Sequence, residues 1–246
     1  MRVRKKFFIV LFMIIILTIG IGKTPLSVFA ASGGRQGAAE LAASQIGLTN
    51  GTKYGAGSGE AWCAYFAGWC ARNGGGIGTS EWPNSGSTTI LVDKFQKMGR
   101  WHDKCNTSWS YQKSGYGTIR GGGKYDNYIP QVGDFVAIDN NGKIADGPDH
   151  TGIVYSVVGN TLTTIEGNIS KKVVKVTYNL STLRPTSNNV GSSTIIIGFG
   201  EPQYPASNQQ PKFNLEAVSG GEGTVQITGW AFDPDSPNTS IGIHVY

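Results

Sequence analysis

The sequence predicts an α+β protein, with helices in the first part of the chain and an antiparallel β-sheet in the second. Three early segments carry apolar residues at helical spacing, and five later segments have the short apolar or alternating patterns of strands. Helices that precede strands, rather than alternate with them, are typical of an α+β domain. The length of 246 residues suits one medium domain and part of another.

The predicted helices cover residues 36–46, about 60–72 and 89–98. In the first, the apolar residues share one side and Gly47 ends the pattern. The second is apolar nearly all round and ends at an Asn-Gly-Gly-Gly sequence, so we expect it to be buried.

The predicted strands cover residues 135–138, 151–158, 162–166, 173–178 and 194–199. Residues 101–128, which precede them, are rich in Gly, Tyr, Ser and Lys without a clear period, and we expect a long loop or insertion there. Its aromatic side chains either line a groove for a glycan or cover the core, and covering the core is the commoner role. These aromatic residues are Trp109, Tyr111, Tyr116, Tyr125 and Tyr128.

Residues 1–30 have the pattern of a signal peptide. Basic residues (Arg2, Arg4, Lys5, Lys6) precede an apolar run over 7–21, and small residues stand before Ala31. The run is shorter than the roughly 20 residues that span a bilayer, which favours cleavage over a membrane anchor. We therefore expect a secreted protein, extracellular or associated with a cell wall, with no stable membrane insertion after cleavage.

The charge of the chain gives no reason to expect a nucleic-acid partner. The whole chain holds 21 Lys and Arg against 16 Asp and Glu, but five of the basic residues lie in the first thirty positions. The mature chain is therefore near neutral, and its excess of positive charge leaves with the leader.

The chain divides into a main domain, a linker and a short β segment. Residues 31–202 hold all the predicted helices and the five strands of the sheet, and residues 203–212 have the Pro, Asn and Gln content of a linker. Residues 213–246 alternate like strands around 225–227 and 241–245, but are too few to fold alone. We expect a partial β-repeat module there.

Cys63 is the candidate nucleophile among three cysteines. It stands in the first turns of the second predicted helix, where unpaired backbone N–H groups and the helix dipole favour a thiolate and can hold an oxyanion. Cys70, seven residues on, lies about 10 Å away along the helix, too far for a disulfide with Cys63. Cys70 is either bonded to Cys105 or a small buried apolar residue.

His150 is the candidate base. It begins a predicted strand, and the neighbouring strand carries Glu166 and Asn168, an arrangement that can orient an imidazole. His102 lies in the irregular region with no evident partner, and His244 lies beyond the linker on a face turned away from the apolar residues.

The hairpin between these two strands fixes which side chains meet. With a two-residue loop, Gly159-Asn160, His150 faces Ile169, and Glu166 points to the other side of the sheet. A three-residue loop over 158–160 places His150 opposite Asn168, with Glu166 on the same face. The chemistry therefore predicts the three-residue loop, or a β-bulge that has the same effect.

Five segments, in order along residues 34–202, resemble the cysteine, histidine-dependent amidohydrolase/peptidase (CHAP) family. The resemblance implies a papain-like fold, with N-terminal helices packed on an antiparallel sheet, and no cofactor. It also implies peptidoglycan as partner and substrate, cut as an N-acetylmuramoyl-L-alanine amidase or a peptide endopeptidase would cut it. The segments are EAWCAYFAGWC (60–70), PQVGDFV (130–136), DHTGIV (149–154), IEGN (165–168) and IIGFGEP (196–202).

The resemblance also implies roles for single residues. Cys63 is the nucleophile, His150 the general base, Glu166 the residue that orients His150, and Asn168 a further polar support. Tyr54, in the loop before the cysteine helix, helps to shape the oxyanion site. Some family members bind calcium through an Asp-rich loop there, but residues 49–59 contain no Asp or Glu, so we expect no metal.

Two other functions compete with this one. A non-catalytic wall-binding or adhesion protein has no need of the complete set Cys63, His150, Glu166 and Asn168. An NlpC-type cysteine peptidase usually has a second His in the position that Glu166 occupies here.

Overall fold

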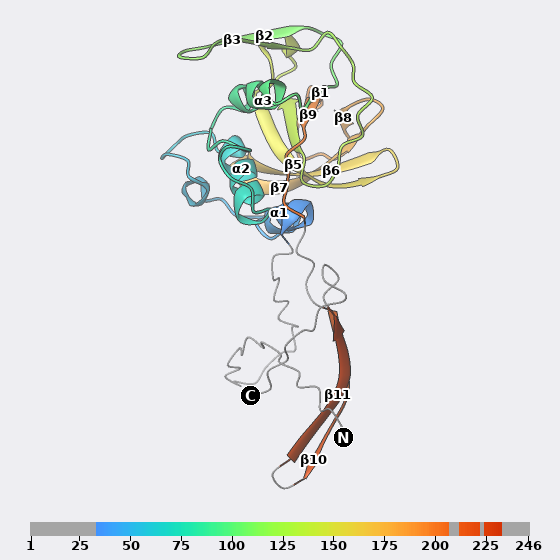
Figure 1. The fold of residues 1–246 in the computed structure, drawn as a ribbon. Coiled ribbons are helices and arrows are strands. Elements are labelled where there is room, and N and C mark those ends of the chain that lie inside the picture. Colours follow the sequence, from blue (N-terminus) through green and yellow to red (C-terminus); the bar gives the residue numbers. More distant parts are fainter. Residues whose placement is uncertain (1–32, 207–211, 222–223, 233–246) are drawn as a thin grey trace. The chain divides into compact units, whose positions relative to one another are not determined.

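The computed structural model describes residues 33–206, 212–221 and 224–232 (Figure 1). Residues 33–206 belong to one compact unit, and the antiparallel pair β10 (Lys212–Gly221) and β11 (Thr224–Phe232) belongs to a second. The expected signal peptide and the expected strand at 241–245 lie outside the described residues. In the described part of the chain, no helix is both long and apolar enough to cross a membrane.

Each predicted helix is present, with its ends shifted by up to three residues. They are α1 (Gly34–Ala43), α2 (Cys63–Asn73) and α3 (Thr88–Lys97), with short 3-10 turns at η1 (Gly51–Tyr54) and η2 (Ile144–Asp146). The expectation that the second helix is buried is confirmed, since most of its side chains are inaccessible. Burial on nearly every side is what an all-round apolar helix requires.

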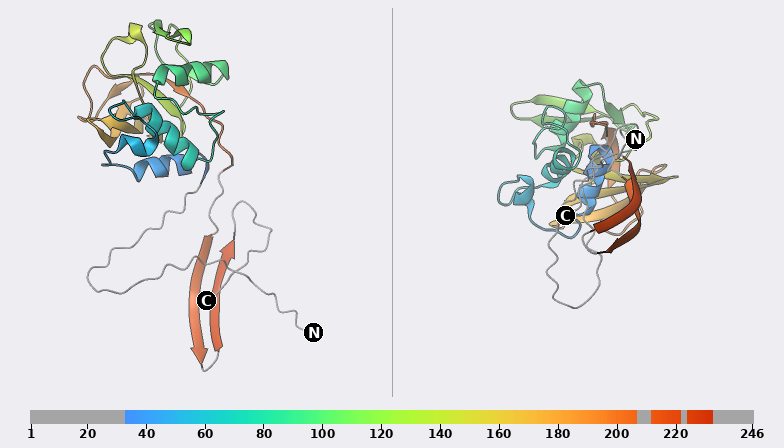
Figure 2. Two further views of the ribbon diagram at one scale, coloured as in Figure 1. Left: turned by 90° about the vertical axis from the view of Figure 1, so that its left-hand side faces the viewer. Right: turned by 60° about the horizontal axis from the view of Figure 1, so that its bottom comes forward.

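The strands form one curled antiparallel sheet in the order β1-β9-β4-β5-β6-β7-β8. Helices α1 and α2 pack side by side against β5 and β6 (Figures 1 and 2), so the predicted α+β, papain-like arrangement is confirmed. The strands are β1 (Trp101–Asp103), β4 (Phe135–Asp139), β5 (His150–Val158), β6 (Thr161–Ile169), β7 (Lys172–Asn179), β8 (Arg184–Pro185) and β9 (Ile195–Gly200).

The predicted loop over residues 101–128 is wrong in part, because the segment contains three strands. β1 adds to the edge of the main sheet, and β2 (Trp109–Lys113) pairs with β3 (Gly117–Gly121) as a separate hairpin near α3 (Figure 1). Only Trp109 and Ile119 of this hairpin are buried. A hairpin with so small an apolar face leaves little periodicity in the sequence.

The β5–β6 hairpin has a regular end and a β-bulge. Val158 pairs with Thr161, so the expected three-residue loop is wrong and the loop is Gly159-Asn160. The pairing then shifts by one residue at Tyr155, and from there on Gly152 lies opposite Glu166. The alternative that the sequence argument allowed, a bulge with the effect of a longer loop, is the one that the fold contains.

Candidate active site

Cys63 is the first residue of α2 and is nearly inaccessible, at 4% exposure. The backbone N–H groups of Ala64 and Thr151 donate hydrogen bonds to its sulfur, and the side chain is also hydrogen-bonded to His150. Free N–H groups of a helix N-terminus stabilise negative charge, so this position favours the thiolate.

His150 begins β5 and lies between Cys63 and Glu166. Its Nε2 is 3.0 Å from Oε2 of Glu166, and its side chain is hydrogen-bonded to Cys63. Because Glu166 occupies Nε2, the ring nitrogen left for the thiol is Nδ1. The bulge at Tyr155 therefore places Glu166 on the same face of the sheet as His150, which is the arrangement that the catalytic hypothesis requires.

Two further side chains hold the Glu166 carboxylate. Oε1 accepts hydrogen bonds from the hydroxyls of Thr164, at 2.6 Å, and Tyr178, at 2.9 Å, while Oε2 faces His150. Glu166 is fully buried, and a buried carboxylate is stable only when its oxygens are paired in this way. Thr164 and Tyr178 were not predicted as partners of Glu166, and the register of β6 and β7 puts both on the Glu166 face.

Two glycines give the site its room. A Cβ on Gly152 would lie 2.6 Å from Cγ of Glu166, and a Cβ on Gly167 would lie 2.7 Å from Cβ of Phe66 on α2. Contacts this short do not occur between real side chains. Gly152 thus leaves space for the carboxylate, and Gly167 lets β6 approach the helix that carries Cys63.

The charges of Cys63 and His150 support each other. Burial by itself raises the pKa of the Cys63 thiol, but the His150 charge and the three hydrogen bonds to the sulfur outweigh it, and the pKa lies below its usual value. Burial lowers the pKa of His150, but Cys63 and then Glu166 reverse this and raise it to about 10. Between these two pKa values the pair is a thiolate and an imidazolium, the form that attacks a carbonyl carbon.

Asn168 has a less defined place. It lies in an irregular stretch between Glu166 and Ile169 in the β6–β7 pairing, and its φ of 66° is left-handed. Asn tolerates this conformation better than most residues. Its side chain has no hydrogen-bond partner within the described residues, so its supporting role stays a prediction.

Tyr54 is a core residue, and its expected part in shaping the oxyanion site stays a prediction. Its ring is 1% exposed and packs on three aromatic rings, Trp62, Phe66 and Trp69, with centroids 5.0–5.5 Å apart. Burial raises the pKa of its hydroxyl to about 12. Tyr54 is buried because it is the last residue of η1, where its large ring packs against α2.

A cleft of about 350 Å³ opens beside Cys63. Its walls come from the start of α3, from η2 and the loop before His150, and from the β2–β3 hairpin. Tyr111 of that hairpin lines the cleft, whereas Trp109 is buried in the core, as expected of an aromatic residue that covers it. The lining residues are Ala61, Cys63, Gly86, Ser87, Thr88, Thr89, Tyr111, Lys113, Asn141, Asp146, Gly147, Pro148 and Asp149.

All three cysteines are free and buried, so the Cys70–Cys105 disulfide that the sequence left open is not formed. Cys70 lies on the same helix as Cys63 but faces the core, where burial raises its pKa well above the usual value for a thiol. The pKa values of the two thiols of α2 are therefore shifted in opposite directions, and only Cys63 is suited to act as a nucleophile.

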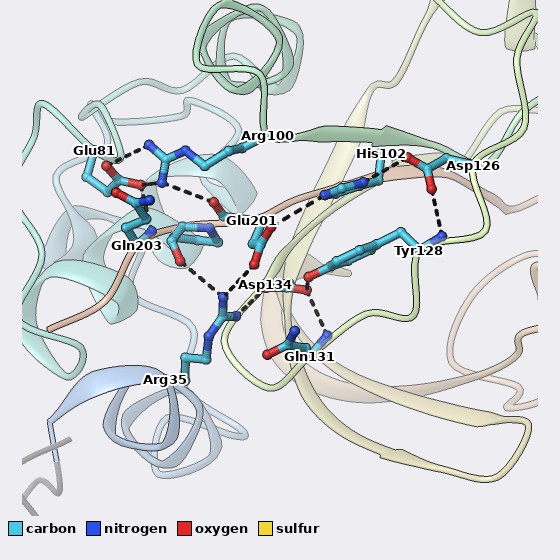
Figure 3. Close-up of polar contacts among 11 residues, drawn as sticks. Arg35, Glu81, Arg100, His102, Asp126, Tyr128, Gln131, Asp134, Glu201 and Gln203 are labelled. Atoms are coloured by element: carbon cyan, nitrogen blue, oxygen red, sulfur yellow. Dashed lines mark hydrogen bonds and ion pairs between the residues drawn. The ribbon is translucent and has the colours of Figure 1, made fainter. Parts of the chain in front are cut away.

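His102 also has a carboxylate partner, contrary to expectation. Its Nδ1 is 2.9 Å from Oδ2 of Asp126, and its ring stacks on Tyr128 with centroids 3.7 Å apart (Figure 3). Tyr128 in turn donates to the buried Asp134, which also pairs with Arg35. This second polar network contains no cysteine, so the contact with a thiol is what distinguishes His150 from His102.

The described residues contain no group of three or more His, Cys, Asp or Glu side chains that could hold a metal ion. Residues 54–168 match the family model for the CHAP domain, a span that includes Cys63, His150, Glu166 and Asn168. No curated protein matches the chain. No solved structure matches it either.

Proposed function

We propose that this chain is a secreted enzyme that cuts amide bonds of peptidoglycan with Cys63 as nucleophile. Its match to the CHAP domain over residues 54–168 implies hydrolase activity of the amidase or peptidase type. The observation that carries the proposal is the chain of contacts from Cys63 through His150 to Glu166, beside an open cleft. The bond is either the N-acetylmuramoyl-L-alanine amide or a peptide bond of the stem or cross-link.

In the first half of the reaction, the Cys63 thiolate attacks the carbonyl carbon of the amide. The carbonyl oxygen becomes an oxyanion, which the leading N–H groups of α2 can stabilise. The His150 imidazolium then gives its proton to the leaving nitrogen, the C–N bond breaks, and the acyl group stays on sulfur as a thioester.

In the second half, neutral His150 takes a proton from water, and the hydroxide attacks the thioester. The C–S bond breaks, the thiolate–imidazolium pair forms again, and the product leaves as a carboxylic acid that loses its proton to solvent. Glu166 keeps the imidazole in the orientation that both proton transfers need, and its charge stabilises the imidazolium.

The wall substrate and the secretion are supported by the leader pattern over residues 1–30 and by the resemblance to wall-cutting relatives. Both belong to the proposal. An exported hydrolase with a cleft near a cysteine would meet the wall directly.

The test is digestion of purified peptidoglycan, followed by mass spectrometry of the soluble products. We expect the wild-type protein to release fragments with one water added per cut, whose new ends identify the bond. Cys63→Ala should release none, while Cys70→Ser, a matched change on the same helix, should keep most of the activity. If the wild-type protein binds the wall without cutting it, or if Cys63→Ala cuts it, the proposal is wrong.

A further inference from the structure

The β2–β3 hairpin turns one face toward the domain. Trp109, Tyr111 and Lys113 alternate along β2 and so share this face, while Ser110, Gln112 and Arg120 point outward and are exposed. The inner face is buried at one end and lines the cleft at the other. The hairpin is therefore one wall of the space beside Cys63.

The anchor of the hairpin is the Trp109 ring. It packs directly on Gly147, where a Cβ would lie 2.8 Å from the ring, and Gly147 is three residues before His150. The hairpin is thus fixed against the loop that leads to the catalytic histidine. Tyr111 and Lys113 keep a defined place relative to the reacting atoms, since they follow Trp109 on the same strand.

The cleft contains charges of both signs that the protein leaves unpaired. Within the described residues, no carboxylate lies within ion-pair distance of the Lys113 ammonium, and no cation lies within that distance of Asp146. Asp149, by contrast, accepts hydrogen bonds from the backbone N–H of Asn140 and the side chain of Asn141. Lys113 and Asp146 are therefore the groups available to a ligand.

We infer that this cleft binds the peptide of the substrate rather than its glycan, with Lys113 holding a substrate carboxylate and Asp146 a substrate ammonium group. A wall peptide carries both kinds of charge next to its amide bonds, whereas the N-acetylated sugars carry neither. The exposed Tyr111 ring offers apolar surface to the same peptide. The inference rests on the proposed function and names the part of the substrate that sets specificity.

The first experiment measures kcat/KM on one soluble wall fragment in three forms: untreated, with its carboxylates amidated, and with its amines acetylated. Lys113→Met should lower kcat/KM about threefold to tenfold on the untreated form and hardly at all on the amidated form. The loss is limited to this range because a partly exposed charge pair contributes little binding free energy. Asp146→Asn should lower kcat/KM on the untreated form but not on the acetylated form.

Arg120→Gln is the matched control, because it removes a positive charge from the outer face of the same hairpin. It should leave kcat/KM on all three forms within about twofold, as expected for an exposed charge away from the cleft. If Lys113→Met and Arg120→Gln have equal effects, or if the loss from Lys113→Met persists on the amidated fragment, the inference is wrong although the proposed function stands.

A second experiment needs no wall substrate. It compares the rates at which iodoacetate, an anion, and iodoacetamide, a neutral reagent of similar size, alkylate Cys63. Lys113→Met should lower the iodoacetate-to-iodoacetamide ratio about threefold, Asp146→Asn should raise it, and Arg120→Gln should not change it. An unchanged ratio in both cleft variants would overturn the inference even if the protein cut no peptidoglycan.

Discussion

A buried thiol and a buried imidazole are each poor candidates for charge when taken alone. Burial raises the pKa of Cys63 and lowers that of His150, so each separately favours its neutral form. Placed in contact, with Glu166 on the far side of the ring, the pair reverses both effects. The reactive state of this site is therefore a property of three residues together.

Glu166→Gln is expected to lower kcat at least about tenfold with little change in KM, because the carboxylate acts on the reacting state. The amide can keep a hydrogen bond to His150 but loses the charge that helps to raise the pKa of His150 to about 10. The imidazolium would then lose its proton at lower pH. The alkaline limb of the kcat/KM profile against pH should therefore move to lower pH.

Glu166→Ala should be slower still, because the ring would also lose its orienting hydrogen bond. Thr164→Val removes one hydrogen bond from the carboxylate without removing its charge, and should have a smaller effect on the pH profile. An alkaline limb that stays in place in Glu166→Gln would show that the carboxylate is only structural.

The sequence could predict Cys63, His150 and Glu166 because each lies at a recognisable point: a helix start, a strand start and the facing strand. It could not predict Tyr178 as a partner of Glu166, since that contact depends on the register of a third strand. Lys113 was not predicted, because nothing around an isolated Lys in a Gly-rich segment indicates which part of the fold its side chain will lie beside.

At the scale of elements, the hairpin β5–β6 shows how function can restrict structure. The requirement that His150 and Glu166 share a face was sound, but it left the choice between a longer loop and a bulge open. The chain uses a tight Gly159-Asn160 turn and places the irregularity at Tyr155. No residue type marks that position, so the place of the bulge could not be derived from the sequence.

Trp109→Ala should destabilise the protein by about 3 kcal/mol, because it removes the large buried ring that fastens the β2–β3 hairpin. The free energy of unfolding in urea measures this. Tyr116→Ala, at the 58% exposed tip of the same hairpin, should change it by less than about 0.5 kcal/mol. Equal values for the two variants would contradict the anchoring role of Trp109.

At the scale of the whole molecule, the order of helices and strands was predictable because long apolar patterns dominate residues 34–100 and 135–200. The insertion between them was not, because its strands expose most of their side chains. Strand β10 of the second unit begins at Lys212, the last residue of the predicted linker. Its predicted last strand lies beyond the described residues.

Removal of metal ions should leave activity within about twofold, since a thiolate nucleophile needs no metal-activated water. The loop over residues 49–59 has no Asp or Glu, and the next carboxylate, Glu60, already accepts a hydrogen bond from the N–H of Gly57 at 2.7 Å. The measurement is wall digestion with and without EDTA. A large loss that calcium restores would count against this prediction.

The central claim, a thiolate–imidazolium pair at Cys63 and His150, is tested most directly by the pH dependence of Cys63 alkylation. Peptide mapping by mass spectrometry can follow iodoacetamide addition at Cys63 separately from Cys70 and Cys105. The wild-type rate should reach its plateau below the usual thiol pKa, whereas His150→Ala should shift the rise above it, because burial would then act with less opposition. Equal profiles for the two proteins, both rising at the usual thiol pKa, would contradict the account.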